Sequence, residues 1–137
     1  MRRARSVEPL ERQSQAAVVQ WWAHACKGYH LPEAALFAIP NGAHLAGDAR
    51  SRAIKMANLK RQGLRNGVPD LFLAAPIKGL STSFVMACGL WIEMKRKGGK
   101  PSPEQAAFLL YARQRGYHAV ICYSSDEAIR AIKAYLA

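Results

Sequence analysis

Apolar residues recur at steps of three and four positions near the start of the chain, a spacing that predicts an amphipathic helix from Pro9 to about Lys27. Gly28 follows as the expected stop. The apolar residues with this spacing are Ala16, Val19, Trp22 and Cys26. Trp21 and Trp22 are adjacent, so both cannot face the core from one helix, and the pattern does not choose between them.

Two shorter segments follow this helix. The apolar run Ala34–Ile39 ends at Pro40-Asn41-Gly42, which predicts a strand and then a turn. Residues 48–62 are polar and basic and contain neither Gly nor Pro, so we expect a helix there.

Two further apolar runs are each closed by helix- and strand-breaking residues. Asp70–Ala75 is followed by Pro76, and Cys88–Lys95 is followed by Gly98-Gly99. The stretch 77–87 between them is a predicted hairpin connection, so we expect two adjacent antiparallel strands.

The last third of the chain predicts a helix, a strand and a helix. Ser102 is the expected N-cap, Pro103 takes the first helical position, and Gln105 completes a capping box in a helix that ends near Arg115-Gly116. His118–Tyr123 is an apolar strand, and a final helix follows it. Either Ser124 or Ser125 caps that helix.

The order of these elements predicts the fold class. A strand, a helix and a second strand in succession imply a right-handed crossover and a parallel pair. Together with the antiparallel pair, this predicts an α/β fold with a small mixed sheet flanked by helices.

Composition supports one globular domain over residues 1–137. Half of the residues (50%) are hydrophobic, and a chain of this length can bury a core without a disulfide or a structural metal. Lys and Arg number 20 against 9 Asp and Glu, so the formal net charge is +11. This excess favours a polyanionic partner, and nucleic acid is the first candidate.

Several other classes of protein are not expected. No stretch of about 18 uncharged apolar residues is present to span a membrane. The basic N-terminus lacks the apolar region of a secretory signal. Cys26, Cys88 and Cys122 form no metal-binding spacing and have apolar neighbours, so we expect buried, reduced thiols in a cytoplasmic protein.

Two acids stand out because they lie in apolar strands of a cationic chain. Asp70 opens one of the two antiparallel strands, and Glu93 lies inside the other, with Lys95 two positions on. Residues two apart in a strand share a side, so Glu93 and Lys95 project together with Met94 opposite, and Asp70 can lie across from Glu93. Two carboxylates and a backbone carbonyl suit a hard cation such as Mg²⁺, and Lys95 can stabilise charge on a phosphodiester.

A plain surface strand is the alternative for these acids, with solvated charges and one Glu–Lys pair. The neighbouring Trp91 and Ile92 argue instead for burial, and an unpaired buried carboxylate is costly. Asp70 alone could simply start a strand after the Gly67-Val68-Pro69 turn. The prediction therefore rests on the joint pattern.

This pattern resembles the PD-(D/E)xK nuclease superfamily, whose two motif halves match Pro69-Asp70 and Glu93-Met94-Lys95 in order. More narrowly, the chain resembles the VRR-NUC family, the virus-type replication and repair nucleases, along nearly its whole length. The matching segments are Glu11–Gln15, Ile39–Gly42, Gly67–Leu71, Ile92–Lys95 and Ser102–Gln105. The resemblance implies a restriction-endonuclease-like αβββαβ core and cleavage of DNA that depends on Mg²⁺ or Mn²⁺.

The resemblance also implies roles for single residues. The implied metal ligands are Asp70, Glu93 and the Met94 carbonyl. Lys95 would be the catalytic lysine. Glu11 would be a helix-borne acid that touches the metal directly or through water, and Gln105 would position the water, the metal or the lysine. For Glu11 the alternatives are a solvated acid at the helix start, or Glu8 in its place. For Gln105 the capping box is a sufficient explanation, and the two roles are compatible.

Cations gather in two segments, one between Ala49 and Pro69 without any acid, and one beside the predicted site across Gly98-Gly99. We expect both to contact DNA phosphates, and a solvated surface is the alternative. The predicted DNA contacts are Arg50, Arg52, Lys55, Lys60, Arg61, Arg65, Arg96, Lys97 and Lys100. His44 could approach DNA from its loop or have no special role.

The expected function is metal-dependent hydrolysis of DNA by an activated water. Small stand-alone members of the family, often phage-borne, resemble four-way-junction resolvases that act as dimers. This implies branched DNA as substrate and the cytoplasm of a bacterium or phage-infected cell. A helicase or other replication protein is a candidate partner. The alternatives are a nicking or flap endonuclease of the same chemistry, and a non-catalytic basic DNA-binding module.

A homodimer is expected because one chain carries one predicted site, whereas a four-way junction needs two symmetric nicks. Apolar residues available for its interface are Trp21 or Trp22 and the run from Leu80 to Ala87. The alternative is that Phe84 and Met86 fill the core.

Overall fold

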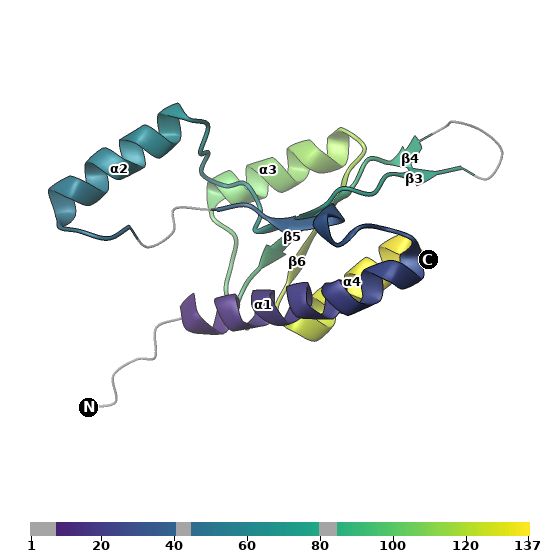
Figure 1. The fold of residues 1–137 in the computed structure, drawn as a ribbon. Coiled ribbons are helices and arrows are strands. Elements are labelled where there is room, and N and C mark those ends of the chain that lie inside the picture. The colour runs from purple at the N-terminus through teal and green to yellow at the C-terminus, as the bar shows by residue number, and fades with distance from the viewer. Residues whose placement is uncertain (1–7, 41–44, 80–84) are drawn as a thin grey trace.

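A four-stranded mixed sheet lies between helices in the computed structural model of the protein, which describes residues 8–40, 45–79 and 85–137 (Figure 1). The strands are β1 (Leu36–Ala38), β2 (Leu71–Leu73), β5 (Leu90–Met94) and β6 (His118–Cys122). Their order is β1-β2-β5-β6, antiparallel except for the parallel β5–β6 pair. The predicted small mixed sheet, with its antiparallel and parallel pairs, is confirmed.

Helices cover both faces of this sheet. The α-helices of the described residues are α1 (Glu8–Ala25), α2 (Ala49–Arg61), α3 (Pro103–Gln114) and α4 (Ser125–Leu136). α1 and α4 lie together against one face, and α3 lies against the other (Figure 1). The predicted capping box of α3 is confirmed, and Ser124 rather than Ser125 is the N-cap of α4.

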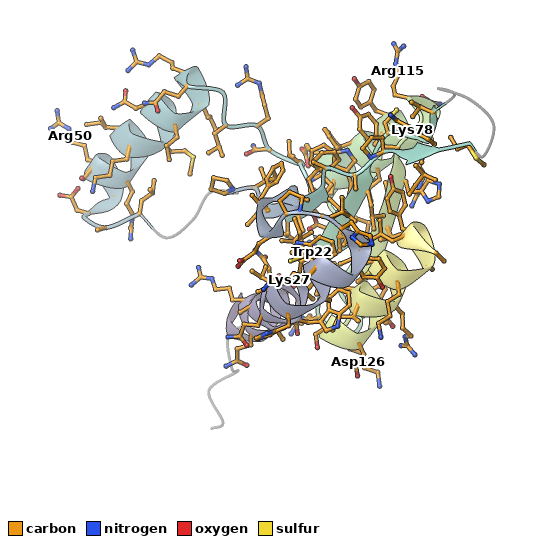
Figure 2. The ribbon with its side chains drawn as sticks, turned by 45° about the vertical axis from the view of Figure 1, so that its right-hand side comes forward. Trp22, Lys27, Arg50, Lys78, Arg115 and Asp126 are labelled. Carbon is orange, nitrogen blue, oxygen red and sulfur yellow. The ribbon has the colours of Figure 1, made fainter. Side chains whose placement is uncertain are left out.

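The end of α1 differs from the prediction. The helix continues as a 3-10 turn, η1 (Cys26–Tyr29), so Gly28 lies inside the turn, and His30 takes the left-handed conformation with φ 57°. The His30 N–H donates to the Lys27 carbonyl and closes the turn. Trp22, at the centre of Figure 2, is fully buried, and its indole N–H donates to the Glu33 carbonyl at 3.0 Å.

The structure also differs from the prediction in the segments before β1 and before β5. A 3-10 turn, η2 (Glu33–Ala35), occupies the first part of the predicted 34–39 strand. The predicted connection between β2 and β5 contains a small sheet of its own, formed by β3 (Ile77–Lys78) and β4 (Val85–Ala87). Cys88 is exposed rather than buried, because it lies in the junction after β4, where its N–H donates to the Gly116 carbonyl outside any strand. The other two cysteines are buried, as expected.

Side chains alternate between two hydrophobic clusters on either side of the sheet. The larger cluster faces α1 and α4 and includes Val18, Trp22, Leu71, Ile92 and Met94. The smaller cluster lies under α3 and consists of Leu109, Ala112 and Ala119, with half-buried aromatic rings packed against it.

α2 stands apart from both layers (Figure 1). None of its side chains is buried, and Asp48 caps its N-terminus by accepting a hydrogen bond from the Ser51 N–H at 2.8 Å. Among the helices of the described residues, none combines the length and the apolarity needed to cross a membrane.

Candidate active site

Asp70 and Glu93 meet where β2 begins and β5 ends. Leu71 pairs with Ile92, and one further step of this antiparallel register places Asp70 across from Glu93. Asp70 Oδ2 accepts a hydrogen bond from the Met94 N–H at 2.8 Å. In a strand, the N–H and C=O of one residue point to the same neighbour, so the Met94 carbonyl is also directed toward the Asp70 side.

Glu93 is held in a buried position with one oxygen satisfied and one not. Its side chain is 2% exposed. Oε1 accepts a hydrogen bond from Gln105 Nε2 at 2.7 Å and lies 3.3 Å from Lys95 Nζ. Oε2 is buried and has no hydrogen-bond partner among the described residues. The predicted shared projection of Glu93 and Lys95 is therefore present.

The environment of Glu93 favours its protonated form when no cation is present. Burial raises the pKa of Glu93 from 4.5 to about 7, and the negative charge of Asp70 adds to this rise. Lys95 opposes the rise through its charge and its hydrogen bond. A hard divalent cation fits this donor set, because it would satisfy Oε2 and balance the two adjacent carboxylates.

Gln105 serves the helix cap and the carboxylate at the same time. Its Oε1 accepts a hydrogen bond from the Ser102 N–H at 2.8 Å, and its Nε2 donates to Glu93. The capping box that the sequence predicts is therefore confirmed, and the same side-chain conformation also contacts the Glu93 carboxylate.

Glu11 reaches the same region from α1. Its Oε1 accepts a hydrogen bond from the Arg96 N–H at 3.2 Å, just beyond the end of β5, and its charge contributes to the raised pKa of Glu93. The side chain of Glu8 lies outside the described part of the chain. Within that part, no three His, Cys, Asp or Glu side chains are close enough together to hold a metal ion.

The sequence places Gly67 in a turn, and the structure shows what this turn packs against. Gly67 has φ 88°, and a Cβ there would lie 2.7 Å from the Glu104 carbonyl carbon and oxygen. The turn that leads into Asp70 therefore packs directly on the first turn of α3, which carries Gln105. The available signal was a glycine three residues before the aspartate, and the contact with α3 could not be predicted from it.

The predicted DNA-contacting cations are exposed and fall in two clusters. The α2 cluster consists of Arg50, Arg52, Lys55, Lys60, Arg61 and Arg65, and the β5–α3 cluster of Arg96, Lys97 and Lys100. Figure 2 shows Arg50 projecting from α2. Some of these side chains also make local contacts: Lys55 donates to the Ala46 carbonyl, Arg65 to the Lys60 carbonyl and Arg61 to Asn58. His44 and the Asn41-Gly42 turn lie outside the described residues.

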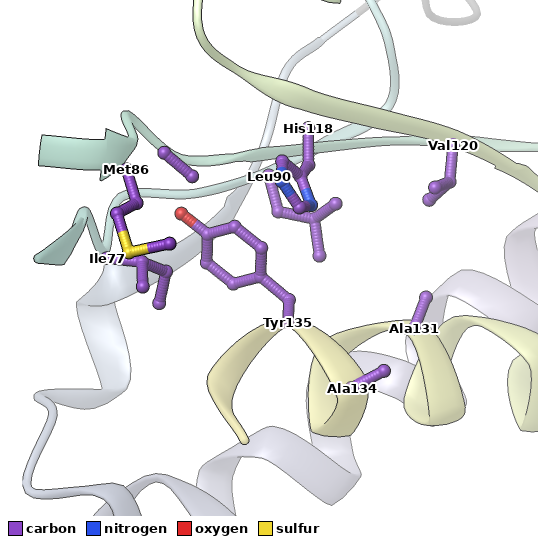
Figure 3. Close-up of a pocket in the computed structure, with 9 residues that line it drawn as sticks. Ile77, Met86, Leu90, His118, Val120, Ala131, Ala134 and Tyr135 are labelled. Carbon is purple, nitrogen blue, oxygen red and sulfur yellow. The ribbon is translucent and has the colours of Figure 1, made fainter. Parts of the chain in front are cut away.

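An apolar cavity of about 370 Å³ lies at the other end of the sheet (Figure 3). Ile77, Met86, His118 and Tyr135 are among its lining residues, and the Tyr135 hydroxyl donates to the Ala75 carbonyl at 2.6 Å. Because Leu90 and His118 begin β5 and β6, this cavity is separate from the carboxylates near the end of β5.

The model of the VRR-NUC domain family matches residues 6–126 of this sequence. The chain belongs to the VRR-NUC domain family. A solved structure entitled "VRR_NUC domain protein" resembles this domain with a TM-score of 0.68 and 20% sequence identity, over 96% of this chain and 90% of that chain. Comparison with curated proteins gives no match. The resemblance inferred from the motifs is confirmed, and the fold is consistent with a PD-(D/E)xK-like core.

The VRR-NUC domain is a nuclease domain, which implies DNA as the substrate. Nucleases of this type generally use divalent metal ions. In this VRR-NUC domain, the motif residues Asp70, Glu93, Lys95 and Gln105 lie together on one face of the sheet.

Proposed function

We propose that this VRR-NUC domain is a structure-specific DNA endonuclease that uses Mg²⁺ or Mn²⁺. The observation that carries the proposal is the Glu93 carboxylate, which is 2% exposed, has one unpartnered oxygen among the described residues and lies across from Asp70. A domain that only bound DNA would gain nothing from two adjacent carboxylates, because they repel phosphate. This argues against the non-catalytic DNA-binding module.

Asp70, Glu93 and the Met94 carbonyl would hold the cation, and Glu11 would act through water. When bound, the cation supplies Lewis-acid activation of water and neutralises charge on the phosphodiester. Gln105 keeps the Glu93 carboxylate in a fixed orientation through the 2.7 Å hydrogen bond. Lys95 is 16% exposed beside Glu93, so its ammonium can reach a phosphoryl oxygen and stabilise the negative charge that develops there.

The two basic clusters would hold the DNA backbone around this site. Arg96, Lys97 and Lys100 follow directly after the end of β5, and Gly98 between them has φ 82° with open space around it. The α2 cluster adds cations on, and just after, a helix with no buried side chain. Such contacts give affinity and register but do not read base sequence.

Branched DNA is the proposed substrate, and a four-way junction cut by a homodimer is the specific form of the proposal. Two identical sites related by a two-fold axis suit a two-fold junction. Trp22 is buried within the protomer and is not available for the interface, whereas Val85 and Met86 are exposed, at 42% and 65%. Met86 therefore does not fill the core, and Phe84 lies outside the described residues. Sedimentation without DNA should give a dimer, and a monomer both free and on junction DNA would contradict this form of the proposal.

A nicking or flap endonuclease is the second candidate, because the same carboxylates serve any of these cuts. The test is incubation with four-way junction, flap, nicked and linear DNA, each with Mg²⁺, with Mn²⁺ and with a chelator. We expect metal-dependent cleavage of the branched DNAs, with the junction cut fastest. Preferred cleavage of flaps would favour the second candidate, and no cleavage of any DNA with either metal would overturn the proposal.

A further inference from the structure

Beyond its acids, the carboxylate face of the sheet carries a row of aromatic side chains. Phe37 pairs directly with Phe72, and Phe72 pairs with Trp91. Directly paired residues on neighbouring strands point to the same face. Asp70 lies two residues before Phe72, and Glu93 lies two residues after Trp91, so the aromatic row and the carboxylates share that face.

The inner rings of this row are packed, whereas its outer ring is open. Phe72 and Trp91 have ring centroids 4.3 Å apart, and Trp91 meets Phe108 of α3 edge-on at 5.1 Å. Phe37 meets Phe72 edge-on at 5.8 Å, which holds its position. Phe37 lies on the edge strand β1 and remains 42% exposed. An exposed phenyl ring held in place by its neighbour is a ready stacking surface.

The open ring lies close to the site along β1. The Ile39 N–H donates to the Asp70 carbonyl at 2.8 Å, so the β1 register runs directly alongside Asp70. Phe37 is two residues from Ile39, which is about 7 Å along a strand. A nucleotide whose phosphate lies at the carboxylates can therefore place its base, or that of its neighbour, over Phe37.

We infer that Phe37 is a stacking platform for an unpaired nucleobase beside the phosphate that enters the site, an inference that rests on the proposed DNA nuclease function. Cationic clusters together with an exposed aromatic ring are the chemistry by which proteins bind single-stranded nucleic acid. Bases inside a duplex are already stacked on both sides, so they leave no free face for the ring. The substrate class is thus branched DNA that frees a base at the branch: a flap does so through its unpaired strand, and a four-way junction does so where a base pair at its branch point opens.

The test measures binding with the full chain in the presence of a chelator, so it does not depend on cleavage. The probes are a flap DNA with 2-aminopurine at the unpaired nucleotide next to the branch, and a nicked duplex of the same sequence without unpaired bases. Phe37→Ala should weaken binding of the flap by about 5- to 150-fold and abolish the fluorescence quenching of the probe. Binding of the nicked duplex should change less than about twofold, because that DNA makes only phosphate contacts.

Three variants complete the design. Phe37→Tyr keeps the ring and should retain affinity and quenching, whereas Phe37→Leu keeps apolar contact with Phe72 but lacks the ring and should lose quenching even if Phe37→Ala does not fold. Tyr111→Ala is the matched control: it removes a more exposed ring, 53% exposed, that lies on α3 against Phe108 rather than on the sheet, and it should change nothing.

Equal quenching by the wild type and Phe37→Leu would overturn the inference. The inference would also be overturned if Phe37→Ala bound both DNAs equally less well and sedimented more slowly than the wild type. That result would mean that a second copy of the chain covers Phe37. Failure of the wild type to cleave any DNA with Mg²⁺ or Mn²⁺ would overturn the proposed function instead, and the binding readout would still decide whether Phe37 stacks on a base.

Discussion

The two faces of the central sheet use the same strand for different purposes. Toward α1 and α4, β5 contributes Leu90, Ile92 and Met94 to an aliphatic core, and all three are at most 1% exposed. Toward α3, the alternate positions of the same strand are Trp91 and Glu93, and Glu93 lies beside Asp70 with an oxygen unsatisfied within the described structure. One face therefore contributes stability, whereas the other gives up part of that stability to hold a buried ionisable group.

This difference shows how a small domain can hold carboxylates rigidly. The carboxylate positions are fixed by main-chain pairing, because Asp70 and Glu93 are one step beyond the Leu71–Ile92 pair and that pair is locked by the opposite core. On the same face, α3 contributes Gln105, which donates a hydrogen bond to the Glu93 carboxylate. We expect substitutions on the two faces to separate catalysis from stability, and the following predictions test that separation.

The largest effect is expected on cleavage, from the carboxylate face. Asp70→Asn, Glu93→Gln and Lys95→Ala should each lower the cleavage rate by at least about a thousandfold, because each removes charge that the reaction needs. Circular dichroism should show an unchanged fold. Near-native turnover by any one of the three, with Mg²⁺ present, would show that its proposed role is wrong.

The next effect is expected on stability, from the core face. Ile92→Ala should lower the free energy of unfolding by about 2–5 kcal/mol, because the side chain is fully buried between the sheet and the α1/α4 layer. Denaturant unfolding measures this. Phe37→Ala, on the exposed edge of the other face, is the control and should cost much less. Similar losses for the two would mean that the faces do not differ as described.

Glu93 should make the metal-free protein less stable as the pH rises. Its pKa is raised from 4.5 to about 7 by burial, so the folded state binds this proton more tightly than the unfolded state. The resulting stability is fully present below pH 4.5 and is lost as the pH rises through about 7. Glu93→Gln removes this dependence and should gain stability relative to the wild type between about pH 5 and pH 8, by up to about 3 kcal/mol. Thermal unfolding in chelator measures it, and a difference that does not grow with pH would contradict the account.

Gly67→Ala should perturb the link between the Asp70 turn and α3. The substitution places a Cβ 2.7 Å from the Glu104 backbone, so the first turn of α3 and Gln105 must shift. Gly63→Ala is a matched control, because Gly63 also has a positive φ, 112°, but open space around it. Both variants should lose about 1 kcal/mol from backbone strain, and only Gly67→Ala should also lose cleavage activity. Equal cleavage activity in the two variants would show that the packing of Gly67 on α3 does not position Gln105.

The smallest effect is expected from the α2 cluster. Arg61→Gln with Arg65→Gln should weaken binding to all DNA sequences and reduce the slope of log K against log salt by about one for each lost phosphate contact. Arg115→Gln neutralises a cation far from α2 (Figure 2) and should leave the slope unchanged. An unchanged slope in the double variant would make α2 a solvated surface.

The sequence predicts the pairing of β2 with β5 because apolar runs and the Pro and Gly residues that end them are local signals. The α3 capping box is predicted for the same reason, since its residues are neighbours in the chain. The exposure of Cys88 could not be predicted, since the junction in which it lies is set by a hydrogen bond to Gly116, which is distant in sequence. Likewise, the turn at His30 depends on main-chain hydrogen bonds to Cys26 and Lys27 rather than on a glycine.

Within the candidate site, motif spacing alone predicts that Asp70, Glu93 and Lys95 lie together. Spacing could not show that one oxygen of Glu93 has no partner among the described residues, because burial of that atom depends on how α3 packs on the sheet. Nor could it show the contact of Glu11 with the Arg96 N–H, which joins residues 85 positions apart.

The most direct test of the central claim, that Asp70 and Glu93 together hold a divalent cation, is a calorimetric titration of Mn²⁺ into the wild type, Asp70→Asn and Glu93→Gln at about pH 6 and pH 8. The wild type should bind Mn²⁺ and bind it more tightly at the higher pH, because a cation must displace the proton that Glu93 retains below its raised pKa. Both variants should lose this binding at both pH values. Undiminished Mn²⁺ binding by either variant would contradict the account.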